Sequence, residues 1–346
     1  MYHPRLRGAH YEMGHHYASL IYKHGFRISQ LPRLSAKALD FGRRSEKIVN
    51  SYFPEILDEI KGFAAGCHGS YDFIVSFLLN IGIEEYQIPK CSVFAAFHGS
   101  DVFFGRNHDY SPAFKKFTES CLVSPEGGYS FVGQSDVFIG KCDGANKKGL
   151  AIGTAFVAGK TPKPGVNFEI ANRYVLEKCA TVQEGTAALS KFQFSTSQNF
   201  LLTDKSGDMA VVEACSTRVR IREPESGGFI VATNNFLHPD MQEMERDHDR
   251  NWFHSETRYR SIYDALKQLN GEINLLTAQR ILSGHYGFVC QYDKSMSIDT
   301  LWSFISNLKE LKILRAEGNP SKTKFKCDSR LSDEIEKQNK TKQNHT

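Results

Sequence analysis

The order of elements in this 346-residue chain predicts an α+β protein, a four-layer αββα sandwich with helices outside two stacked sheets. Helical periodicity comes first, at about 10–66 and again at 71–85, and strand patterns then dominate residues 91–157. The expected later elements are helices at 167–179 and 182–192, strands over 199–231, helices at 256–269 and 278–282, and strands up to 314. No repeat or linker divides the chain, and its 40% hydrophobic content is enough for a large core.

A β-hairpin is the clearest local element. Residues 92–97 and 102–105 are rich in Val, Phe and Ala, and residues 98–101 supply the turn sequence His-Gly-Ser-Asp. Antiparallel pairing brings Cys91 to the same end of the hairpin as Arg106 and Asp109. A guanidinium there can stabilise a thiolate and hold a carbonyl oxygen, while Asp109 can accept a hydrogen bond from an ammonium group.

Cys91 gains unusual chemistry if the chain is cut between Lys90 and Cys91. It would then carry a thiol that titrates near ~8.5 and a free α-amine that titrates near ~8. The amine could act as general base for the thiol, so that no catalytic histidine is needed. A cysteine among apolar residues is also typical of an inert core, and the local sequence leaves that reading open.

The hairpin motif resembles a known family. Cys-Ser-Val-Phe-Ala at 91–95, followed by Gly-Arg-Asn-His-Asp-Tyr at 105–110, is similar to the acyl-coenzyme A:6-aminopenicillanic acid acyltransferase family. That family belongs to the linear-amide hydrolases, which include choloylglycine (bile salt) hydrolases. The likeness runs from about residue 8 to about residue 316. Its other motifs appear in the expected order, at 8–14, 59–66, 149–153, 199–204, 211–213, 232–236 and 300–303.

The resemblance implies an N-terminal-nucleophile hydrolase fold and a precursor that cuts itself between Lys90 and Cys91. Residues 1–90 would be a helical pro-segment packed as one domain with the nucleophile-bearing core at 91–317. The implied catalyst is the Cys91 thiolate, which forms a thioester first with its own chain and then with a substrate amide, without a cofactor.

The resemblance also assigns site residues. Cys91 matches the nucleophile, Arg106 and Asp109 the pair that orients it, and Asn234 a donor to the oxyanion. Arg258 matches an arginine that supports the site, with Arg260 close enough to compete for that role.

Structural explanations stand beside three of these roles. From the local sequence alone, Asn234 could as well be a turn former. Arg258 could be a solvated surface arginine, and Asp109 could simply end a strand. The chain also departs from relatives of the bile salt hydrolase type, because Ala155 stands where they have an asparagine. Thr154 or a backbone amide could substitute for it.

Three functions remain open from the sequence. The leading one is a self-processing cysteine amidase that hydrolyses a linear, non-peptide or small peptide-like amide. The second is an N-acyltransferase that uses acyl-coenzyme A, and the third is a catalytically idle member of the fold. A papain-like pair of Cys91 with His98 is disfavoured, because His98 lies at the far end of the hairpin.

Composition argues against several other classes. The net charge is +4, of which +3 lies in residues 318–346, so the body is near neutral and nucleic acid is not an expected partner. That tail is polar, and we expect it to be disordered. The longest apolar stretch, 73–83, is too short to cross a membrane, and the first residues lack the apolar core of a signal peptide.

Cysteine and histidine spacing completes the picture. The eight cysteines are scattered without a CxxC pair, which favours reduced thiols and a cytoplasmic location. The histidines form no metal-ligand pattern, and the glycine pairs form no dinucleotide-binding fingerprint. The expected partner is therefore a small-molecule acyl amide, with acyl-coenzyme A as the alternative donor.

Overall fold

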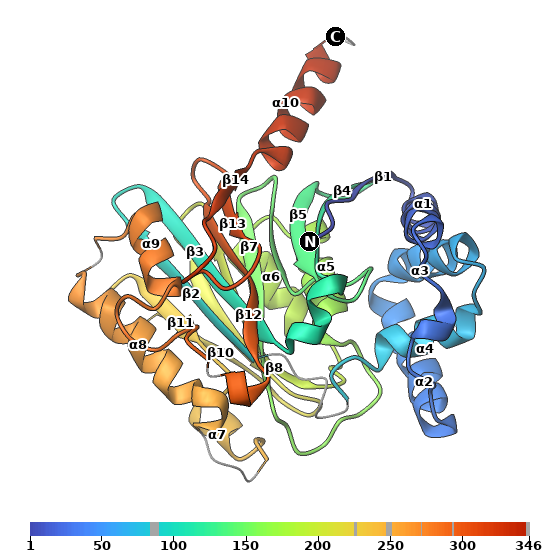
Figure 1. The fold of residues 1–346 in the computed structure, drawn as a ribbon, viewed down its shortest axis with the longest axis horizontal. Helices are drawn as coiled ribbons and strands as arrows, with labels where there is room; N and C mark the ends of the chain where they lie inside the picture. The colour runs from blue at the N-terminus through green and yellow to red at the C-terminus, as the bar shows by residue number, and fades with distance from the viewer. Residues whose placement is uncertain (84–89, 225–226, 247–250, 271, 293, 344–346) are drawn as a thin grey trace.

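The structure is a computed structural model that describes residues 1–83, 90–224, 227–246, 251–270, 272–292 and 294–343. Figure 1 shows the predicted α+β architecture, with helices outside two central sheets. The α-helices of the described residues are α1 (His10–Lys23), α2 (Ala36–Tyr52), α3 (Pro54–Gly66), α4 (Tyr71–Leu79), α5 (Phe168–Lys178), α6 (Val182–Leu189), α7 (Pro239–Gln242), α8 (Ser255–Gln268), α9 (Leu275–Leu282) and α10 (Arg330–Gln343). Residues 84 and 85, at the end of the helix predicted over 71–85, lie outside the described residues.

The first sheet has eight strands in the order β1-β4-β5-β6-β7-β8-β9-β10. All its neighbours are antiparallel except β1 and β4, which run parallel. Its strands are β1 (Arg5–Gly8), β4 (Glu119–Pro125), β5 (Phe131–Ser135), β6 (Asp143–Asn146), β7 (Leu150–Val157), β8 (Ser197–Asp204), β9 (Met209–Ala214) and β10 (Val219–Arg222).

The second sheet is entirely antiparallel and has six strands in the order β11-β2-β3-β12-β13-β14. Its strands are β2 (Lys90–His98), β3 (Asp101–Tyr110), β11 (Phe229–Ala232), β12 (Asp299–Asn307), β13 (Lys312–Ala316) and β14 (Lys326–Asp328). The predicted hairpin is its β2–β3 pair.

The layers follow the predicted αββα order. Helices α8 and α9 cover the outer face of the second sheet, and α5 and α6 cover the outer face of the first (Figure 1). Strands β2, β3 and β12 contact the first sheet across the middle of the sandwich. Alternation along β2 follows from this arrangement. Cys91, Val93 and Ala95 belong to the core between the sheets, whereas Phe94 and Ala96 pack with α8 and α9.

Helices α1 to α4 form a separate flank of the sandwich (Figure 1). The backbones of α1 and α3 touch through glycines of the motifs at 8–14 and 59–66. A Cβ on Gly14 would lie 1.9 Å from the Glu59 backbone oxygen, and one on Gly62 would lie 2.0 Å from the backbone oxygen of Tyr11. A buried ion pair between Glu59 and Arg173, 2.7 Å long, ties α3 to α5 of the sandwich.

The C-terminal tail differs from the expectation of disorder. Residues 326–328 add β14 to the second sheet, and residues 330–343 form α10, which projects from the body (Figure 1). Leu331 is fully buried, and Asp328 pairs with Arg315 of β13 and with Arg330. Composition concealed these contacts because the tail is held by few apolar residues, Leu331 and Ile335, and by ion pairs such as that of Glu334 with Arg7. Residues 344–346 lie outside the described residues.

No helix among the described residues is both long and apolar enough to span a membrane. All eight cysteines are free thiols, and Cys327 is exposed whereas the others are buried.

We predict that Asp328→Asn destabilises the fold by about 3 kcal/mol at pH 7, because it removes the carboxylate that the buried side chains of Arg315 and Arg330 share. Burial raises the pKa of Asp328, but the hydrogen bond from Arg330 and the charge of Arg315 hold it below its ordinary value of 3.8. The carboxylate therefore stabilises the fold above pH 3.8, and that stabilisation disappears as the pH falls through the lowered folded-state pKa.

Urea unfolding of parent and variant at several pH values measures this difference. The control is Asp333→Asn, which changes an exposed carboxylate of α10. Equal stability of all three proteins at pH 7 would show that the ion pairs of Asp328 do not stabilise the fold.

Candidate active site around Cys91

Cys91 lies at the start of β2 and is fully buried between the two sheets. The hairpin register places it opposite His108, and places Val93 opposite Arg106. Because side chains alternate along a strand, Cys91, Arg106 and His108 all point to the same face. The Cys91 sulfur lies 3.0 Å from Nη2 of Arg106 and 3.9 Å from Nδ1 of His108.

Arg106 is held by carbonyl and carboxylate oxygens as well as by the sulfur. Its Nε and Nη2 donate to the Thr154 carbonyl at 3.0 and 2.9 Å, and its Nη1 pairs with Asp143. Burial lowers the pKa of Arg106, but Cys91 and Asp143 outweigh this and raise it above its ordinary value. The guanidinium therefore stays charged beside the thiol. Gly153 leaves room for it, since a Cβ there would lie 2.8 Å from Cδ of Arg106.

His108 is the site residue that the sequence reasoning missed. Its Nε2 lies 3.2 Å from Oδ2 of Asp136, and its ring stacks on Trp302 at 3.8 Å with an angle of 6° between the planes. Burial lowers the pKa of His108, but Asp136 and Cys91 outweigh this and raise it to about 9. The sequence could have revealed this neighbour. Pairing the two strands residue by residue from the turn, starting with His98 and Asp101, sets Cys91 opposite His108.

Asn234 and Arg258 hold the backbone of the nucleophile. Oδ1 of Asn234 accepts from the Cys91 amide at 3.0 Å and from Nη2 of Arg258 at 2.8 Å. Nη1 of Arg258 donates to the Cys91 carbonyl at 2.6 Å and to Ser92 Oγ at 2.9 Å. Arg258 is fully buried and Arg260 is exposed, so the structure selects Arg258 and excludes the surface-arginine alternative.

Contacts with the first sheet hold the loop that carries Asn234. Asn199 of β8 donates to the carbonyls of Thr233 and Asn235, each at 2.8 Å. Nδ2 of Asn234 donates to the Phe156 carbonyl at 2.7 Å, so Asn234 joins the two sheets rather than simply forming a turn. Ala155, the departure from relatives of the bile salt hydrolase type, is buried opposite Asn199 in β7 and adds no polar group.

Asp109 lies apart from the thiol. In the register it faces Lys90, one residue out of phase with Cys91, so its side chain points to the opposite face of the sheet. Its carboxylate accepts from Thr300 Oγ1 at 2.6 Å and from the Tyr292 hydroxyl at 2.7 Å. Burial raises the pKa of Asp109, against opposing effects of Arg258 and of these hydrogen bonds. The predicted contact of Asp109 with a Cys91 amine stays a prediction.

Lys90, on the other side of the expected cut, is also buried. Its Nζ lies 3.8 Å from the centre of the Trp252 ring and 4.6 Å from that of Phe253. Both distances are within the range of a cation–π interaction. The residues on both sides of the Lys90–Cys91 bond are therefore held in place.

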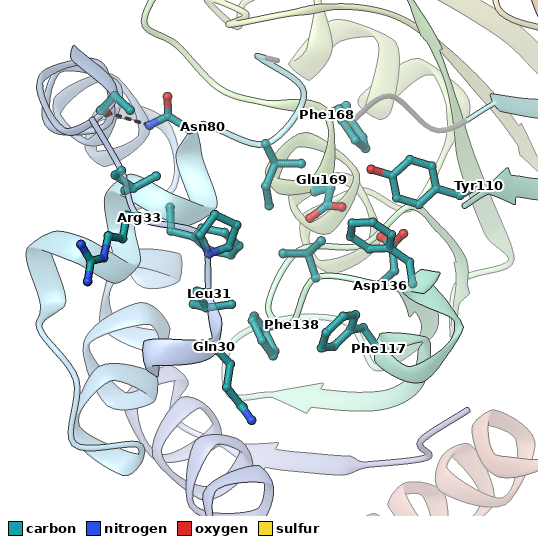
Figure 2. Close-up of a pocket in the computed structure, with 17 residues that line it drawn as sticks. Gln30, Leu31, Arg33, Asn80, Tyr110, Phe117, Asp136, Phe138, Phe168 and Glu169 are labelled. Atoms are coloured by element: carbon teal, nitrogen blue, oxygen red, sulfur yellow. Dashed lines mark hydrogen bonds between the residues drawn. The ribbon is translucent and has the colours of Figure 1, made fainter. Parts of the chain in front are cut away.

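A cavity of about 270 Å³ lies between the N-terminal segment and the sandwich (Figure 2). Leu31, Phe117, Phe138 and Phe168 contribute to its largely apolar wall, while Asp136 and Glu169 supply carboxyl groups. Asp136 therefore belongs both to this wall and to the His108 contact. Burial and the nearby Asp136 raise the pKa of Glu169 to about 8.

Asp136, Cys142 and Glu169 are the one group of potential metal ligands found among the described residues, with donor atoms within 4.8 Å of one another. The Cys142 thiol lies 3.6 Å from Oε1 of Glu169 and 3.9 Å from Oδ1 of Asp136. Hydrogen bonds through this thiol thus connect the three groups.

Three of the solved structures that are similar to this chain are 15 to 17% identical to it. Penicillin V acylase from Agrobacterium tumefaciens is 17% identical with a TM-score of 0.48, over 66% of this chain and 83% of that one. An N-acylethanolamine-hydrolyzing acid amidase ortholog from Caenorhabditis elegans is 16% identical with a TM-score of 0.48, over 63% and 93%. A mutant of conjugated bile acid hydrolase from Clostridium perfringens is 15% identical with a TM-score of 0.47, over 69% and 96%.

A search of curated proteins finds no match. The sequence model of one family matches residues 97–322, which is more than half of the chain and includes Arg106, Asn234 and Arg258. This match confirms the family that the hairpin motif and the ordered downstream motifs predicted. The chain belongs to the acyl-coenzyme A:6-aminopenicillanic acid acyl-transferase family.

Proposed function

We propose that the protein is a self-processing cysteine amidase. It cuts its own chain between Lys90 and Cys91 and then hydrolyses a linear, non-peptide or small peptide-like C–N amide through a thioester on Cys91. The observation that carries this proposal is the convergence of three buried side chains on one residue. Arg106 contacts the Cys91 sulfur, Asn234 its backbone nitrogen and Arg258 its carbonyl oxygen.

Self-cleavage begins when the Cys91 thiolate attacks the Lys90 carbonyl carbon. A bond forms between sulfur and carbon, the Lys90–Cys91 C–N bond breaks, and the nitrogen takes up a proton to become the α-amine. Water then hydrolyses the thioester, which releases the Lys90 carboxylate and regenerates the thiol. The new amine is bonded to the same carbon skeleton as the thiol and can act as its base on a substrate.

The contacts around Cys91 suit this chemistry. Arg106 places a permanent positive charge at the sulfur, which favours a thiolate and stabilises its attack. Oδ1 of Asn234 is positioned to accept from the freed amine as it does from the backbone amide. An asparagine side chain carries two N–H donors, and we assign one of them to the oxyanion, a role worth on the order of 3 kcal/mol.

The cavity favours a substrate whose acyl group binds between the N-terminal segment and the sandwich. Its wall is largely apolar, and Asp136 connects it to His108, which is opposite Cys91. Apolar walls with a few convergent polar groups are typical of small-molecule sites. The intact site around Cys91 argues against an idle member of the fold.

Acyl transfer is the second candidate, favoured by the family to which the chain belongs. The thioester on Cys91 is common to both reactions, and an amine in place of water would give transfer. Release of free coenzyme A thiol from an acyl donor, dependent on an added acceptor amine, would identify this activity.

The first test is the intact mass of the purified protein under denaturing conditions. We expect fragments of about 10 and about 29 kDa, in proportion to residues 1–90 and 91–346 of the 39.1 kDa chain. Cys91→Ala should stay whole, because it lacks the nucleophile. Cys179→Ala changes another buried cysteine and should be cut like the parent. A single uncut mass for the parent would contradict the proposed self-processing.

Arg106→Lys should slow self-cleavage on the order of 100-fold, because one ammonium group cannot contact the sulfur, Thr154 and Asp143 together. Arg173→Lys is the matched control. Arg173 is an equally buried, ion-paired arginine, but its partners are Glu59 and Glu177. Both variants should unfold at lower temperature, and only Arg106→Lys should be cut slowly in a time course of intact mass. Equal cutting rates would remove Arg106 from the mechanism.

Leu31→Trp should change the acyl chains that the enzyme accepts, because it narrows the apolar cavity (Figure 2). We expect KM for long-chain amides to rise by about 10-fold or more, with short-chain amides unaffected. The control is Leu276→Trp, which enlarges a leucine that is 64% exposed on α9. It should leave KM unchanged for long-chain and for short-chain amides. The same KM for every chain length in Leu31→Trp would place the acyl group elsewhere.

A further inference from the structure

The intact chain lacks the base that the cut enzyme would use. Before cleavage the Cys91 nitrogen is an amide, which donates to Asn234 and cannot accept a proton from the thiol. The first attack on Lys90 therefore needs another proton acceptor close to the sulfur. General-base catalysis typically contributes 10²- to 10⁴-fold to a rate. Without a proton acceptor for the thiol, self-cleavage of the intact chain would therefore be slow.

His108 has the geometry of such an acceptor. It is directly opposite Cys91 in the β2–β3 register, and its Nδ1 lies 3.9 Å from the sulfur. Its other ring nitrogen lies 3.2 Å from Asp136, and the stack on Trp302 fixes the plane of the ring. A nucleophile, a base within reach and a third group that orients the base are the three parts of a catalytic triad.

We infer that His108 takes the thiol proton of Cys91 in the intact chain, with Asp136 as the residue that positions it. This inference rests on the proposed self-cleavage and names the group that starts it.

The proton balance of the step is complete without an external reagent. The S–H bond of Cys91 breaks, its proton moves to Nδ1 of His108, and a thiolate and an imidazolium result. The thiolate attacks the Lys90 carbonyl carbon, and the proton passes from the imidazolium to the Cys91 nitrogen as the C–N bond breaks. The cut enzyme then has an α-amine of its own, so His108 starts the maturation step.

Charges act on both sides of the His108 ring. Nη2 of Arg106 lies 3.1 Å from Nδ1 and disfavours an imidazolium, whereas Asp136, 3.2 Å from Nε2, favours it. A thiolate between Arg106 and a protonated His108 faces two cations, since Nη2 of Arg106 lies 3.0 Å from the sulfur. Asp136 faces the other side of the ring and neutralises the imidazolium. The remaining titratable groups that interact with His108 are Asp109, Glu169 and the nearby Tyr110 ring.

The test follows cleavage of the newly made full-length chain by cell-free translation and gel analysis over time. His108→Phe keeps a ring to stack on Trp302, and His108→Asn keeps a polar group, but neither can accept the proton. We expect both to cut at least about 100-fold more slowly than the parent at pH 7. His98→Asn, an exposed histidine of the same hairpin, should cut at the parental rate. Either His108 variant, folded and cutting at the parental rate, would overturn the inference.

Asp136→Asn tests positioning by a readout that a purely structural residue would not move. The imidazolium must supply its proton to the leaving nitrogen, so the parent rate should fall as the pH rises through about 9. Removal of the Asp136 charge should shift this decline to lower pH. An unchanged pH profile would exclude Asp136 from this role.

If the parent is never cut, the self-processing proposed above fails, and the inference about His108 is decided separately. NMR of ¹⁵N-histidine-labelled protein then compares the titration of His108 in the uncut parent and in Cys91→Ala. A midpoint that falls by about one pH unit or more without the thiol supports proton transfer between the two side chains. The same midpoint in both proteins overturns it.

Discussion

The antiparallel pairing of β2 with β3 is the constraint on which the rest of the site depends. Its register sets Cys91 against His108 and directs Arg106 to the same face, while Asp109 points to the other. A shift of one residue would turn the thiol toward α8 and α9 and separate it from Arg106. The neighbouring strands hold this register, because β11 and β12 flank the hairpin on both sides. The site is thus built on rigid strands in the interior of the sandwich.

Buried charge is balanced locally around the nucleophile. Arg106 is paired with Asp143, whose Oδ2 also accepts from Trp302 Nε1 at 2.9 Å, and His108 is paired with Asp136. Buried charges are costly unless they are paired and hydrogen-bonded, so this network fixes each side chain in one position. The same positions give a thiol with a cation on one side and an imidazole on the other, which is the preorganisation that nucleophilic catalysis needs.

Much of the fold was predictable, and the errors have physical causes. Val, Phe and Ala runs around a Gly-Ser-Asp turn specify the hairpin, and the αββα order follows from the alternation of helical and strand periods. The tail was misjudged because Leu331 and the ion cluster of Asp328 stabilise it, which composition cannot reveal. Cys91 and Arg106 follow from the motif. The burial of Arg258 and the contact of Asp136 with His108 arise only from tertiary packing between segments distant in the chain.

The central claim is that Cys91 carries the acyl group during turnover. The most direct measurement is the mass of the enzyme after acid quenching during turnover of an amide substrate, followed by peptide mapping. We expect the fragment that begins at Cys91 to gain the mass of the acyl group at its first residue, and hydroxylamine to remove it, as for a thioester. Steady turnover without an acyl adduct, or an adduct on another residue such as Cys142, would contradict the account.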